Sequence, residues 1–135
     1  MSARPDGWTW ALGAFGLVNL LNGAWMIFDP SGWYTGIPAA VPDFGPLNHH
    51  FVRDIGATYV TVGVALLWAA RSREARAFAV GLVMVFYALH AAGHVYDTAS
   101  GRVGAEHWWI DFPAIYLPVF LLLPAWAALA ARNRR

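Results

Sequence analysis

Histidine and aspartate residues recur at helical spacing in three separate stretches of this sequence, and they are its clearest candidates for chemistry. Within each stretch the polar residues are three or four positions apart, so that in a helix they share one face. Imidazoles and carboxylates on facing helices are common ligands of metal sites in helical bundles. The three groups are His50 and Asp54; Tyr87, His90, His94 and Asp97; and His107 and Asp111.

We predict that these stripes turn inward and meet in one polar pocket, because exposing an ionisable group to lipid costs several kcal/mol. The candidate ligands, taken at a common depth in the membrane, are His50, Asp54, His94 and Asp111, with His90 as the floor of the pocket. Tyr87, Asp97 and Arg53 are predicted to support these ligands by packing or by neutralising charge. His49 and His107 are expected to be solvated.

The residue types restrict which cofactor such a pocket could take. The sequence contains no Cys, and a set of imidazole and carboxylate ligands suits a divalent transition metal such as zinc, iron or copper. Haem is disfavoured because two axial histidines on facing helices need an open slot that four crowded helices do not leave. Two alternatives without a metal remain open. The histidines could exchange protons between pH 5 and 8, or they could be ordinary polar helix ends.

Composition places these stripes in a membrane protein. Of the 135 residues, 59% are hydrophobic and only 13% are charged, whereas soluble domains are nearer half apolar and a quarter charged. Four apolar runs approach the length of roughly 20 residues that a membrane-spanning helix needs. The sequence therefore predicts one domain over residues 1–135, an all-α antiparallel four-helix membrane bundle. Its helices are expected over residues 8–28, 50–70, 75–97 and 107–131.

The distribution of arginine predicts the orientation of this bundle. Two arginines, Arg53 and Arg102, lie on one side of a four-pass chain, and seven lie on the other. The positive-inside rule then places both termini in the cytoplasm and the histidines on the outer side. The seven are Arg4, Arg71, Arg73, Arg76, Arg132, Arg134 and Arg135.

The connection over residues 30–48 is rich in proline and glycine, which predicts an irregular segment rather than a helix. It also contains apolar residues such as Trp33 and Phe44. We therefore expect it to lie folded over the outer mouth of the bundle.

The four-pass plan, this Pro- and Gly-rich connection and the stretch Asn48–Gly56 (NHHFVRDIG) resemble small bacterial inner-membrane proteins, including DoxX-like proteins and families without an assigned function. The resemblance implies a multi-pass protein of the cell inner membrane.

The predicted partners are the lipid bilayer and either a second copy or another membrane protein. A net charge of +1 argues against nucleic acid. Two functions stay open: a pocket for a metal or small ligand, and a non-catalytic accessory or scaffold subunit.

Overall fold

The computed structural model describes residues 4–132, and its regular secondary structure is helical. Four helical segments are long and apolar enough to cross a membrane, which confirms the expectation of an all-helical protein with four such segments. Three of them are the helices α1 (Gly7–Phe28), α3 (His49–Arg71) and α4 (Arg76–Ala99). The fourth, Phe112–Arg132, joins the π-helical turn η2 (Phe112–Tyr116) to α6 (Leu117–Arg132). Arg134 and Arg135 lie outside the described residues.

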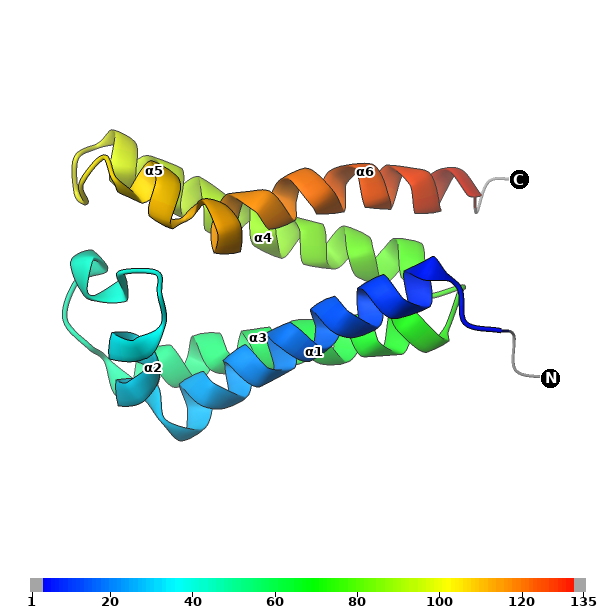
Figure 1. The fold of residues 1–135 in the computed structure, drawn as a ribbon, viewed down its shortest axis with the longest axis horizontal. Coiled ribbons are helices and arrows are strands. Elements are labelled where there is room, and N and C mark those ends of the chain that lie inside the picture. Colours follow the sequence, from blue (N-terminus) through cyan, green and yellow to red (C-terminus); the bar gives the residue numbers. More distant parts are fainter. Residues whose placement is uncertain (1–3, 133–135) are drawn as a thin grey trace.

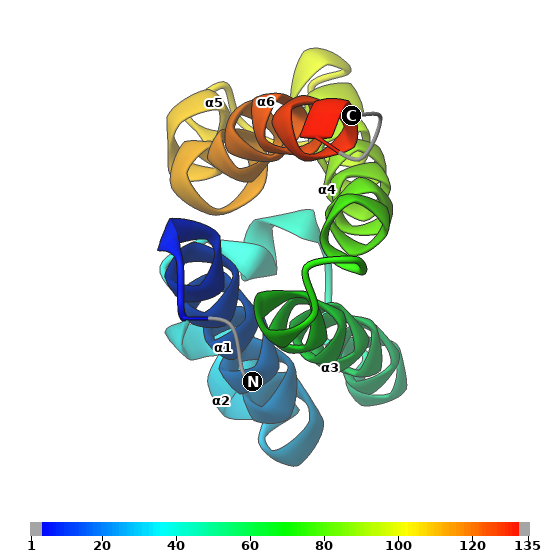
Figure 2. The same ribbon diagram turned by 90° about the vertical axis from the view of Figure 1, so that its right-hand side faces the viewer.

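The long helices form two pairs (Figures 1 and 2). Helix α1 packs along α3, and helix α4 packs along η2 and α6. The pairs are joined by the short connection from α3 to α4, whereas α1 makes no close backbone contact with α6 among residues 4–132. This arrangement leaves the space between the pairs to be filled by side chains and by the segment between α1 and α3.

Glycines bring α1 and α3 into backbone contact. A Cβ atom on Gly23 would lie 2.5 Å from the carbonyl oxygen of Gly56, and one on Gly63 would lie 2.8 Å from that of Gly16. No side chain fits at such an approach, so small residues are required there. The contact fixes which face of α3 is buried, and this face includes Gly56, Tyr59 and Gly63.

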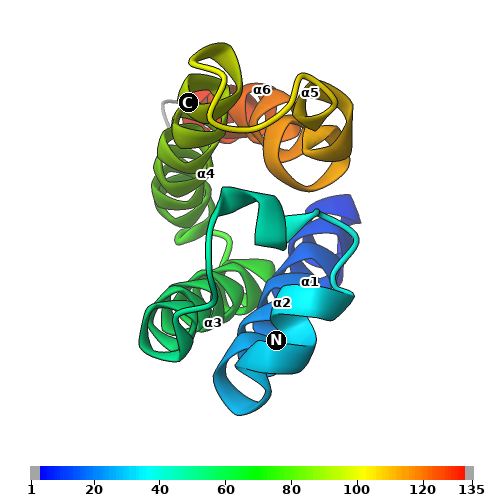
Figure 3. The same cartoon turned by 90° about the vertical axis from the view of Figure 1, so that its left-hand side faces the viewer.

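The segment between α1 and α3 contains two short helices, so the prediction of an irregular connection over 30–48 is wrong in part. Helix α2 (Pro30–Gly36) follows α1 directly, and a 3-10 turn, η1, spans Val41–Phe44. The side chain of Asp29 accepts a hydrogen bond of 2.9 Å from the backbone N–H of Gly32, which caps α2. Pro30 occupies the first helical turn, where proline favours a helix start because its missing N–H is not needed. Figure 3 shows this segment lying across one end of the molecule.

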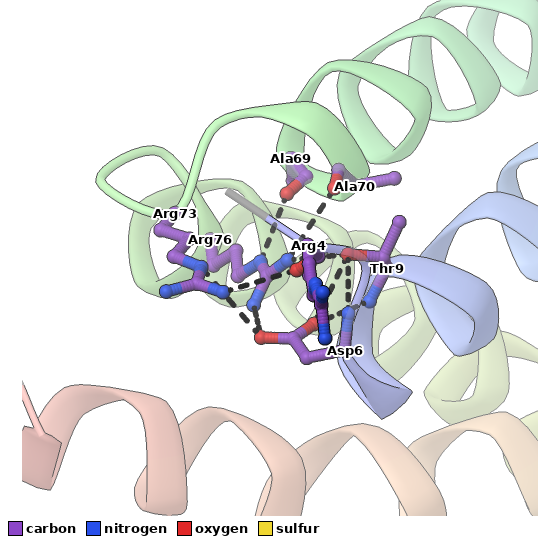
Figure 4. A network of polar contacts seen from close by, with 7 residues as sticks. All are labelled: Arg4, Asp6, Thr9, Ala69, Ala70, Arg73 and Arg76. Atoms are coloured by element: carbon purple, nitrogen blue, oxygen red, sulfur yellow. Dashed lines mark hydrogen bonds and ion pairs between the residues drawn. The ribbon is translucent and has the colours of Figure 1, made fainter. Parts of the chain in front are cut away.

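The opposite end of the molecule is closed by a buried arginine (Figure 4). The Arg76 side chain, only 5% exposed, donates to the Asp6 carboxylate at 2.8 Å and to the Thr9 hydroxyl at 2.9 Å. It also donates to the carbonyl oxygens of Ala69 and Ala70 at the end of α3. These contacts tie the start of α1 to the α3–α4 connection, and we call this group of residues the Arg76 clamp.

Candidate functional site

A cavity of about 530 Å³ lies between the two helix pairs, at the end away from the Arg76 clamp. Its wall is mostly apolar and includes residues from all four long segments. The segment 37–44 covers it with Ile37, Ala39, Val41 and Phe44. The polar residues of the wall are Asn19, Asn22, Tyr59, Tyr87, His90 and His94. The position of segment 37–44 agrees with the expectation that the connection over residues 30–48 folds over the bundle.

A buried aspartate lies next to the two histidines that line the cavity, His90 and His94, which we call the histidine wall. Asp111 is fully buried, and one of its carboxylate oxygens lies 2.8 Å from Nδ1 of His94. Asp111 sits between the short helix α5 (His107–Ile110) and the π-helical turn η2, where its carbonyl accepts from the N–H of Ile115 and weakly from that of Tyr116. The π-helical turn interrupts the regular hydrogen-bond pattern of an α-helix. Pro113 favours this interruption because it has no backbone N–H to donate. The interruption orients Asp111 toward His94 on the neighbouring helix α4.

His107 completes this group, and the expectation that it is solvated is wrong. It is fully buried, with Nδ1 3.3 Å from Asp111 and Nε2 3.2 Å from Asp43. Burial opposes its charge, but hydrogen bonds and charge from Asp43 and Asp111 outweigh that effect and raise the pKa of His107. Sequence reasoning missed Asp43 as a partner because it lies 64 residues away in the chain.

The covering segment also contacts these histidines through an aromatic ring. The Phe44 ring lies edge-on to His94 and to His107, with centroid distances of 4.7 and 4.8 Å. Phe44 and Asp43 are neighbours in η1. Together they attach the segment that follows α1 to the α4–α6 pair, so this segment bridges the two pairs above the cavity. We call Asp43, His94, His107 and Asp111 the Asp111 network.

His90 extends the histidine wall toward the middle of the membrane. Its ring lies 4.8 Å from that of His94 and stacks on Phe86 at 5.9 Å with an interplanar angle of 5°. The predicted position of His90 beneath His94 agrees with this geometry. Within residues 4–132, neither His90 nor Nε2 of His94 has a hydrogen-bond partner.

Two further polar pairs fix the opposite wall. Tyr87 donates a hydrogen bond of 2.9 Å to Asn19, which is buried on α1. The indole N–H of Trp33 donates to Asn22 at 2.9 Å, which holds this ring of α2 against the cavity. Tyr87 therefore links α4 to α1, rather than supporting a histidine as the sequence predicted.

His50 and Asp54 do not join the other candidates, so the prediction that their stripe turns inward is wrong. They form an exposed pair, with a distance of 3.4 Å and side chains that are 87% and 61% exposed. The reason is the glycine contact described above, which turns a different face of α3 toward α1. Thr58 and Thr61, which follow Asp54 along α3 at helical spacing, donate to carbonyls one turn earlier and thus satisfy their hydroxyls without a partner helix.

Arg53 and Asp97 also lie apart from the histidine wall. Arg53 is exposed and donates to the carbonyl of Ile27, and Asp97 pairs with Arg102 at 3.5 Å. Neither supports a ligand in this structure.

The arrangement gives no support to a metal centre. No group of three or more His, Asp or Glu within the described part of the chain converges as a metal ion would need. Nδ1 of His94 and both ring nitrogens of His107 are engaged with carboxylates instead. The site is an apolar cavity with two imidazole rings, those of His90 and His94, in its wall.

Four apolar spanning segments and a cavity between them define a multi-pass helical membrane protein. The chain belongs to the family described as a domain of unknown function, DUF4345, which matches residues 8–130. Comparison with curated proteins and with solved structures found no match.

Proposed function

We propose that this protein binds a small, largely apolar molecule in the cavity between its helix pairs. In this proposal it is an antiparallel four-helix protein of the bacterial inner membrane with both termini in the cytoplasm, so that the cavity faces the outer side. The arginines at the Arg76 end support this orientation through the positive-inside rule.

The single observation that carries the proposal is the cavity itself. Its volume of about 530 Å³ lies within the range of small-molecule sites, which are mostly apolar with a few placed polar groups. The glycine contact within one pair and the Asp111 network beside the other hold its walls in place. An accessory subunit that contacts a partner only through its surface has no need of such a space.

The residues at the rim indicate how a ligand enters. Val18 on α1 and Pro113 and Ala114 on η2 line the cavity and are exposed. In a membrane this surface faces lipid, and α1 and η2 make no close backbone contact within residues 4–132. We therefore propose that the ligand enters from the bilayer, between α1 and η2.

A saturable-binding experiment tests the proposal. The protein is reconstituted in lipid nanodiscs and titrated with the neutral dye N-phenyl-1-naphthylamine, with empty nanodiscs as the reference for partitioning. We expect one saturable site per chain. Ala114→Trp should fill the cavity and weaken this binding at least about tenfold, whereas Ala57→Trp, on an exposed position outside the cavity, should not.

Two results would refute the binding function. One is dye uptake that only follows the lipid content. The other is an equal response of the two tryptophan variants.

A further inference from the structure

We infer that the molecule bound in this cavity is neutral and carries a hydroxyl group that lies between His94 and His90. This inference rests on the proposed function and names the chemical class of the ligand. It follows from the part of the hydrogen-bonding capacity of these two cavity-lining imidazoles that no residue within 4–132 uses.

His94 offers an acceptor. Its Nδ1 lies 2.8 Å from the Asp111 carboxylate, and an ionised carboxylate can only accept, so Nδ1 carries the proton. In a neutral imidazole the other nitrogen, Nε2, then has a free lone pair. Nε2 has no partner within residues 4–132, and His94 lines the cavity. A ligand that donates a hydrogen bond is therefore favoured at this position.

His90 offers a donor. An imidazole carries at least one N–H in either charge state, and the His90 ring has no hydrogen-bond partner among the described residues. Its ring centroid lies only 4.8 Å from that of His94. One group of the ligand can thus meet both rings. A hydroxyl donates and accepts at once, whereas a carbonyl or an ether oxygen only accepts.

The remaining wall indicates what the rest of the ligand is like. Among the described residues, the cavity wall contains no Asp, Glu, Lys or Arg, so a charged ligand would find no permanent counter-charge there. Burying an unpaired charge is costly, which favours a neutral molecule. Aromatic rings on several elements provide flat apolar contacts for its body, namely Phe15, Trp33, Phe44, Phe51 and Tyr59. A lipid-soluble phenol meets all of these conditions.

Matched naphthalenes test this inference in nanodiscs. 2-Naphthol and its methyl ether, 2-methoxynaphthalene, are each used to displace N-phenyl-1-naphthylamine, with both affinities corrected for partitioning into empty nanodiscs. We expect 2-naphthol to bind about tenfold more tightly, because the ether leaves the His94 acceptor unpaired. His90→Phe removes the donor and leaves no protein group unpaired. Because the hydroxyl and the ether oxygen can both accept from His90, this variant should weaken the binding of both ligands by about threefold and keep most of the preference. His94→Phe should abolish the preference.

His50→Phe, at an exposed histidine outside the cavity, is the matched control and should keep both affinities and the full preference. If His94→Phe does not fold, the wild-type preference and the effect of His90→Phe still decide the question. Equal affinity for 2-naphthol and its ether in the wild type would overturn the hydroxyl inference while leaving the binding function intact. Absence of saturable binding for the dye and for both naphthalenes would overturn both.

Discussion

The two ends of this molecule use buried charge in opposite ways. At one end the Arg76 clamp joins α1 to the α3–α4 connection, with each polar atom of the guanidinium directed at an acceptor. At the other end the Asp111 network joins η1 to α4 and α5 through two histidines beside a cavity. At the first end the donor nitrogens of a permanent cation, Arg76, all have acceptors within the protein. At the second end, Nε2 of His94 and the His90 ring have no hydrogen-bond partner among the described residues and can bind a ligand.

The difference also gives the two ends opposite responses to pH. The hydrogen bond from Arg76 and that from the Thr9 backbone hold the pKa of Asp6 well below its usual range. A lowered carboxylate pKa stabilises the fold at neutral pH, and the contribution is lost as pH falls. The pKa of His107 is raised, so its contribution is full below the ordinary histidine pKa of about 6.5 and is lost as pH rises through the raised value.

The largest expected effect concerns which end lies on which side of the membrane. The sequence has no Cys, so single cysteines can be introduced at Ser72, beside the clamp, and at Ser100, at the other end. We expect a membrane-impermeant maleimide to label Ser100→Cys in intact cells and Ser72→Cys only after lysis. The reverse pattern would place the cavity on the cytoplasmic side and require the proposed orientation to be abandoned.

The next effect is on stability at the clamp. Arg76→Met removes four hydrogen bonds and leaves the Asp6 carboxylate and two carbonyls without this partner. We expect the melting temperature in detergent to fall by roughly 5–10 °C. Arg73→Met is the control, because Arg73 is 58% exposed and lies 3.7 Å from the same carboxylate. It should change the melting temperature by no more than about 2 °C. Similar losses for the two variants would contradict the central role of Arg76.

A smaller loss of stability, with a larger loss of binding, is expected at the other end. Asp111→Leu leaves Nδ1 of His94 and of His107 without their shared acceptor. The melting temperature should fall by roughly 3–5 °C, and the preference for 2-naphthol over its ether should disappear because Nδ1 is no longer fixed as the donor. Asp54→Leu, on the exposed face of α3, should alter neither quantity. If Asp111→Leu kept the full preference, the tautomer argument for His94 would fail.

The smallest effect is the pH response of the covering segment. Deprotonation of His107 weakens its link to Asp43, so amide protection of residues 41–45 should decrease as pH rises from 6 to 8.5, after correction for intrinsic exchange. The decrease should be about twofold to threefold, since Asp43 is 53% exposed and its ion pair is screened. Hydrogen exchange followed by mass spectrometry measures this change. Asp43→Asn should remove most of the pH dependence, and an unchanged slope in this variant would rule out the link.

Hydropathy and spacing were sufficient to predict the four spanning segments and the position of His94 and His90 together with Asp111. They were insufficient to predict which face of α3 is buried, because the exposed residues His50 and Asp54 follow the same periodicity as a buried stripe. Close packing of glycines, and not polarity, decides which face of α3 is buried. At a helix end near the membrane surface, polar side chains can remain exposed at little cost.

The covering segment shows a second limit of local reasoning. Proline and glycine in this segment predict an irregular connection, although Asp29 followed by Pro30 is also a helix-start signal. The partnership of Asp43 with His107 depends on how η1 lies over the cavity. No local pattern in the sequence encodes that contact.

The backbone contact between α1 and α3 has a mechanical consequence. No layer of side chains separates these helices at Gly16, Gly23, Gly56 and Gly63. The two helices therefore have little freedom to shift against each other, and the pair should move as one rigid arm. The second arm is α4 with α6, and the Arg76 clamp lies where the chain passes from one arm to the other. Small rotations about that pivot would produce their largest displacement at the far end, between α1 and η2. The cavity can thus adjust to ligands of different size by rotation of one pair against the other, within the limits set by the contacts of Asp43 with His107 and of Tyr87 with Asn19.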